Sequence, residues 1–95
     1  MINCSHAGDW YPNDPAGLDQ ATTSYLQQAT PFQFKETRQR KMKGVLSPHA
    51  GLEYSGKCAA YGYQYLPPGT KRVIVLGPSH YQGFGGCLVS QGSRI

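Results

Sequence analysis

The chain has 95 residues, a formal net charge of +4 at pH 7 and only 15% charged residues. This length allows one small domain and no more. The mild positive charge does not require a nucleic-acid partner, and no apolar run in the sequence is long enough to span a membrane.

The N-terminus lacks the basic and apolar regions of a signal peptide. Cys4, Cys58 and Cys87 are scattered, odd in number and without a C-x-x-C pair. This pattern favours reduced thiols inside a cell over a disulfide framework. The sequence therefore predicts a cytoplasmic protein.

A loop rich in glycine, proline and small residues opens the chain at residues 5–12, yet it carries His6, Trp10 and Tyr11. One interpretation is an aromatic wall at a ligand pocket, with His6 nearby. The other is a terminal segment that is tied down by burying Trp10, and the pattern by itself favours this second interpretation.

A helix is predicted to follow the loop. Asp14 is a good N-cap, and Pro15 suits the first helical position. Apolar residues then recur at helical spacing until Pro31, and they give one stripe: Leu18, Ala21, Tyr25, Leu26 and Ala29. We expect this helix to cover a sheet and to have no chemistry of its own.

Residues 31–43 form a basic linker with five lysines and arginines and a single glutamate. A phosphate- or nucleic-acid-binding arm is one interpretation. However, no aromatic residues alternate with the charges after Phe34, and no nucleic-acid motif is present. The pattern is more typical of a solvated loop, so we expect no nucleic-acid partner.

A βαβ unit is predicted over residues 44–80. Short apolar runs at residues 45–46 and 73–76 are cut off by proline or glycine and are typical of buried strands. Residues 55–66 are long enough for a helix with Ser55 as N-cap, and residues 67–69 stop it. Two parallel strands joined by a helix predict an α/β fold with a mostly parallel sheet and flanking helices.

His49 and His80 follow the two predicted strands. Because parallel strands end at the same edge of a sheet, we expect these histidines to be neighbours, at the edge where open α/β sheets bind ligands. Two imidazoles there suggest half of a metal site, or a general base with a partner. The alternative is that each histidine caps a strand and hydrogen-bonds a nearby carbonyl.

Glu53 and Tyr54 are expected in the loop after His49. Glu53 could orient a metal-bound histidine from behind, although a surface charge is equally consistent with the sequence. Tyr54 could line a pocket.

The sequence after residue 86 suggests another strand at residues 87–90, with no closing helix before Ile95. A parallel sheet of two or three strands with so few helices cannot cover both of its faces. We therefore expect residues 1–95 to be the incomplete N-terminal part of a larger single domain. The remainder of that domain, or another chain, would complete it.

Three sequence blocks resemble the Memo (mediator of cell motility) family. They are Ser-His-Ala-Gly-Asp-Trp-Tyr at residues 5–11, Ser-Pro-His-Ala-Gly-Leu-Glu-Tyr-Ser-Gly at 47–56 followed by Cys-Ala-Ala at 58–60, and Val-Leu-Gly-Pro-Ser-His at 75–80. Their order and spacing also match, and the resemblance covers nearly the whole chain except the basic linker.

This resemblance implies an α/β fold similar to that of the class III non-haem iron-dependent dioxygenases, in proteins about three times longer than this chain. It implies that His49 and His80 are ligands of a redox metal, iron or copper, together with a cysteine that occurs much later in the family. None of the cysteines here matches that ligand, so the third ligand is absent from this chain. In the family, residues matching Trp10 and Tyr54 line the pocket that contains this metal, so the resemblance implies that Trp10 and Tyr54 are pocket residues here.

The resemblance further implies a role in cell motility signalling and binding to phosphotyrosine-containing receptor tails. Mixed imidazole and thiolate ligation suits iron, copper or zinc, and an open position would admit dioxygen or a small molecule. The first hypothesis is a metal-dependent oxidoreductase, which in this chain alone would be inactive. A non-enzymatic phosphotyrosine-peptide module using the same pocket is the second, and zinc hydrolysis with Glu53 as base is the third.

Overall fold

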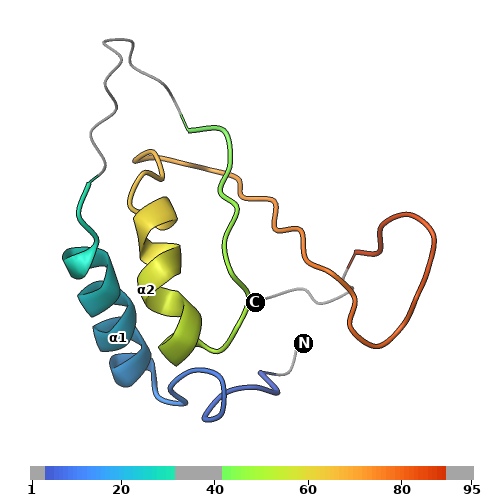
Figure 1. Cartoon of the computed structure of the whole chain (residues 1–95), viewed down its shortest axis with the longest axis horizontal. Helices are drawn as coiled ribbons and strands as arrows, with labels where there is room; N and C mark the ends of the chain where they lie inside the picture. Colours follow the sequence, from blue (N-terminus) through green and yellow to red (C-terminus); the bar gives the residue numbers. More distant parts are fainter. Residues whose placement is uncertain (1–3, 32–41, 90–95) are drawn as a thin grey trace.

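The structure is a computed structural model that describes residues 4–31 and 42–89. Within these ranges the chain forms two helices, α1 (Pro15–Gln28) and α2 (Leu52–Tyr63). They pack side by side and run in the same direction, with their N-terminal ends at the foot of the view in Figure 1. The N-terminal loop passes beneath these ends, and residues 42–50 lead down beside α2 to its first residue (Figure 1).

Helix α1 begins where the sequence predicts. The Asp14 carboxylate accepts a hydrogen bond from the Gly17 amide, and Pro15 occupies the first turn. The helix ends at Gln28, and the amide of the next residue, Ala29, donates to the carbonyls of Tyr25 and Leu26. Its partner is α2, because α1 packs against that helix and not against a sheet in the described part of the chain.

The predicted N-cap of α2, Ser55, was wrong by four residues, since the N-cap is Gly51, and the helix ends at Tyr63, three residues before the predicted end at Leu66. The helix begins at Leu52 after Gly51, which offers no side-chain cap, and Ser55 lies inside it. Ser55 is buried, and its hydroxyl donates to the carbonyls of Ala50 at 2.8 Å and Gly51 at 3.1 Å. Because the helix starts early, Glu53 belongs to its first turn and not to a loop.

The two helices approach closely at Gly56. A Cβ atom added there would lie 2.7 Å from Cε2 and 2.8 Å from Cδ2 of Tyr25, which is closer than real carbon contacts allow. Glycine therefore permits the Tyr25 ring to lie directly against the backbone of α2. The core around this contact is small, and the buried residues among those described are Ala29, Ser55, Gly56 and Ala60.

The predicted strands are not formed in the described residues. One isolated bridge joins Ala7 to Tyr11, and no ladder of strand hydrogen bonds occurs in residues 4–31 and 42–89. Ile74, Val75 and Leu76 are 83–85% exposed. A strand needs a partner for its backbone amides and carbonyls, and these residues have no partner strand in the described structure. The parallel α/β sheet stays a prediction.

Most of the predicted basic linker, residues 32–41, lies outside the described residues. No helix in the described part of the chain has the length and the apolar character needed to span a bilayer.

Candidate functional site

His49 and His80 lie next to each other in space, although the whole of α2 separates them in the sequence. Their ring centroids are 5.2 Å apart, and the ring planes are inclined by 55°. Both side chains are exposed. His49 precedes α2 by a few residues, and His80 follows the predicted strand at residues 73–76, so the two incoming segments converge at the histidines.

This spacing fits two ligands of one metal ion. Nitrogen ligands bind zinc-like metals at about 2.1 Å, which places the centroids of two imidazoles on one ion roughly 5 Å apart. Within residues 4–31 and 42–89, no group of three or more histidine, cysteine, aspartate or glutamate side chains is arranged to hold an ion. Within the described residues, this pair of imidazoles is therefore not joined by a third side chain of these types.

His6 and Trp10 form a second aromatic pair. Their ring centroids are 4.6 Å apart with the planes tilted by 35°, and the Trp10 amide donates to the His6 carbonyl at 2.9 Å. Gly8 makes this turn possible, because its φ is 85°, a backbone angle that residues with a Cβ atom rarely adopt. The interpretation in which the loop is tied down by burying Trp10 is wrong, because 44% of its surface is exposed, and the role of His6 and Trp10 in a ligand pocket stays a prediction.

A pocket of about 370 Å³ lies beside this aromatic pair. Its lining combines the N-terminal loop with the start of α2 and one residue of α1: His6, Trp10, Tyr11, Leu18, Ala50, Leu52 and Ser55. Ala50 directly follows His49 in the sequence. The pocket is thus next to the chain segment that carries the first histidine, and its wall is mainly apolar and aromatic.

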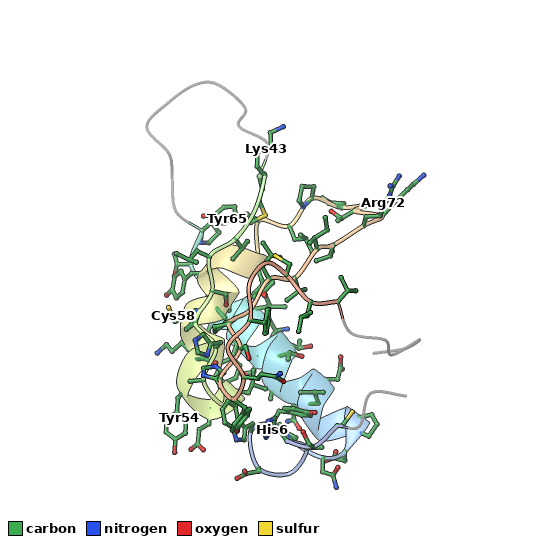
Figure 2. The ribbon with its side chains drawn as sticks, turned by 90° about the vertical axis from the view of Figure 1, so that its right-hand side faces the viewer. His6, Lys43, Tyr54, Cys58, Tyr65 and Arg72 are labelled. Atoms are coloured by element: carbon green, nitrogen blue, oxygen red, sulfur yellow. The ribbon has the colours of Figure 1, made fainter. Side chains whose placement is uncertain are left out.

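Tyr54 and Glu53 are adjacent in the sequence but lie in different surroundings. Tyr54 is 82% exposed and lines neither of the two pockets found beside the loop. Figure 2 shows Tyr54 and His6 at the same end of the molecule, with Lys43 and Arg72 at the opposite end. Glu53 lines a separate pocket together with Trp10. Its role behind a histidine stays a prediction, since no hydrogen bond links Glu53 to His49 or His80 in the described structure.

Tyr11 has an altered acidity. Desolvation raises the pKa of its phenol above the ordinary value of 10.0, and the neighbouring Cys4 adds to the rise through a side-chain hydrogen bond and through its charge. The phenol is therefore a neutral hydroxyl group at physiological pH.

Sequence reasoning missed Asp9 and Tyr25 as lining residues of the separate pocket. Tyr25 was assigned to a helix without chemistry. One sequence feature could have indicated that Tyr25 shares a surface with Ala21: the two residues are four positions apart, which places them on one helix face. Nothing in the local sequence of Asp9 indicates that α2 would lie opposite it.

Comparison with known proteins gives a family match that spans both the aromatic loop and the two histidines. The family of Memo-like proteins matches residues 3–95. The chain belongs to the Memo family.

Individual relatives come from vertebrates, nematodes and yeast. The chain is 38% identical to protein MEMO1 of Xenopus tropicalis over 87 residues, which are 90% of the chain and 27% of the relative. It is 37% identical to the memo-1 homolog of Caenorhabditis elegans over 93 residues, with 97% and 25% covered. It is 43% identical to a MEMO1 family protein of Schizosaccharomyces pombe over 90 residues, with 94% and 27% covered.

The chain spans about a quarter of the length of these curated relatives. No solved structure gives a significant match to it.

Proposed function

We propose that this chain provides two imidazole ligands, His49 and His80, to a redox-metal site of a Memo-like protein. The observation that supports the proposal is the 5.2 Å separation of the two rings, which suits two ligands of a single ion. Iron or copper is the expected metal, and zinc is compatible with the same nitrogen ligands.

The site needs at least one further ligand. We propose that it comes from the remainder of a longer domain or from another chain, because the described residues provide only the two imidazoles at this place. When bound, iron or copper would supply one-electron redox chemistry. In a complete protein, the site would therefore support a metal-dependent oxidoreductase activity.

The surrounding residues would bind and orient a small molecule beside the histidines. The pocket of about 370 Å³ is walled by the His6–Trp10 pair and Leu52, and it offers a large apolar and aromatic surface. Tyr54 lies on the exposed side of the α2 N-terminus and would contribute to this site only when a further segment covers it. A cytoplasmic location and a role in cell motility signalling belong to the same proposal.

Copper binding followed by electron paramagnetic resonance tests the metal proposal directly. We expect Cu²⁺ added to the chain to show nitrogen coupling from two imidazoles. His49→Ala and His80→Ala should each remove that signal, because a single remaining imidazole binds weakly. His6→Ala is the matched control and should retain it, since His6 pairs with Trp10. A signal that survives both substitutions, or that His6→Ala removes, would contradict the proposal.

A second candidate function is docking of a phosphotyrosine peptide. It is favoured by the exposure of both rings, because two adjacent imidazoles can donate N–H groups to one phosphate. Calorimetry with a phosphorylated peptide and its unphosphorylated twin separates the two functions. Equal affinities would exclude peptide docking through phosphate, and loss of a phosphate-dependent signal in His80→Ala would support it.

A further inference from the structure

A second pocket of about 260 Å³ lies between the N-terminal loop and the two helices. Its lining residues come from all three segments: Gly8, Asp9, Trp10, Tyr11, Pro12, Ala21, Tyr25, Leu52 and Glu53. Neither His49 nor His80 is among them, so the pocket is separate from the proposed metal ligands. Among the described residues, no lysine, arginine or histidine lines it either.

Three aromatic residues line this pocket, and the structure fixes the position of each. The Trp10 carbonyl accepts a hydrogen bond of 2.7 Å from the Leu52 amide, which fixes the loop to α2. The Tyr25 ring lies against the α2 backbone at Gly56. Tyr11 is joined to the same turn, because its carbonyl accepts from the Gly8 amide at 2.8 Å. The aromatic surface is therefore largely formed before any ligand arrives.

Two carboxylates reach the same pocket from different elements. Asp9 comes from the loop, and Glu53 comes from the first turn of α2. Neither side chain has a hydrogen bond or an ion pair within the described residues. In a chain with a formal net charge of +4, this pocket carries two carboxylates, and none of its described lining residues is a cation that would neutralise them.

We propose that this pocket binds a small quaternary ammonium ion. Faces of tryptophan and tyrosine attract organic cations through their ring quadrupoles, and tryptophan attracts them most strongly. The two carboxylates add charge attraction, and they would repel an anionic ligand. The methyl groups of such an ion bury apolar surface against Trp10, Tyr25 and Leu52, which a hydrated metal ion would not do. This function goes beyond the metal site and does not depend on it.

The single tryptophan of the chain gives a direct test, because Trp10 itself lines the pocket. The probe is choline, and the matched control ligand is 3,3-dimethylbutan-1-ol, which has the same shape without the charge. We expect choline to change the Trp10 fluorescence saturably, with the neutral alcohol binding about fivefold or more weakly. An equal response to both ligands, or no saturable response to choline, would overturn the proposal.

Substitutions then locate the site. Asp9→Asn and Glu53→Gln should each weaken choline binding about threefold, as expected for exposed charges, and should leave binding of the alcohol unchanged. Tyr25→Leu should weaken it by a similar factor by removing one ring. Asp19→Asn is the control, because Asp19 is an exposed acid of α1 outside the lining, and it should bind choline normally.

Circular dichroism of each variant confirms that α1 and α2 persist. If Tyr25→Leu disturbs the helices, Asp9→Asn and Glu53→Gln still test the proposed choline site, since neither the Asp9 nor the Glu53 side chain packs in the core. Unchanged choline affinity in both acid variants would overturn the proposal.

Discussion

The amide of Leu52 donates a hydrogen bond of 2.7 Å to the carbonyl of Trp10. Leu52 is the first residue of α2, and its N-cap, Gly51, has no side chain that could accept from the helix amides. The loop carbonyl therefore takes the place of a local cap. The same bond brings Trp10 to the start of α2, where both pockets form.

Gly8→Ala should loosen the N-terminal loop. Gly8 has a φ of 85°, which costs a residue with a Cβ roughly 1 kcal/mol or more. We expect a lower stability and a more solvent-exposed Trp10 emission, read from fluorescence during urea unfolding. Gly44→Ala is the control, because a Cβ there meets nothing within 4 Å and φ is not positive. Equal effects of the two substitutions would contradict the role of the Gly8 turn.

Gly56→Ala should separate α1 from α2. The new methyl group would collide with the Tyr25 ring, at 2.7 Å from Cε2, so the net loss of stability should be about 1–3 kcal/mol despite the better helix propensity of alanine. Thermal unfolding followed by circular dichroism measures it. Lys57→Ala changes the adjacent exposed position of the same helix and should be close to neutral. A melting temperature of Gly56→Ala at or above that of the unchanged chain would show that the close approach does not matter.

The chain should self-associate through residues 73–76. Ile74, Val75 and Leu76 are 83–85% exposed, and contiguous apolar residues in an unpaired segment favour pairing with another chain. Ile74→Lys should shift the chain toward monomer in analytical ultracentrifugation. Gln27→Lys adds the same charge at an exposed position of α1 and should leave the association unchanged. A chain that is monomeric at all concentrations and melts sharply would contradict this prediction.

The Tyr11 phenol should titrate above pH 10, because desolvation and Cys4 raise its pKa in the folded chain. Since the folded state favours the protonated form, this contribution to stability is fully present below the unfolded pKa near 10. It is lost as the pH rises through the higher folded pKa. Tyrosinate absorbance of the chain minus that of Tyr11→Phe isolates the transition. Cys4→Ala should lower the pKa of Tyr11, whereas Cys87→Ala should not.

The sequence by itself determined the start of α1, and it predicted that His49 and His80 lie close to each other. Asp14 and Pro15 act within one turn of the chain, so their effect on the helix is readable without tertiary structure. The proximity of His49 and His80 was predicted from a strand, helix, strand connection. The structure places their rings 5.2 Å apart, although the strands themselves are not formed in the described residues.

Only the tertiary structure decided where α2 begins and which side chains share a pocket. The acceptor for the Leu52 amide is the carbonyl of Trp10, which belongs to a distant part of the sequence, so no local pattern predicts the helix start. Tyr25 and Glu53 meet around one pocket because Gly56 lets the two helices touch. Contacts of this kind depend on the packing of one element on another, whereas capping and helical spacing depend on residues a few positions apart.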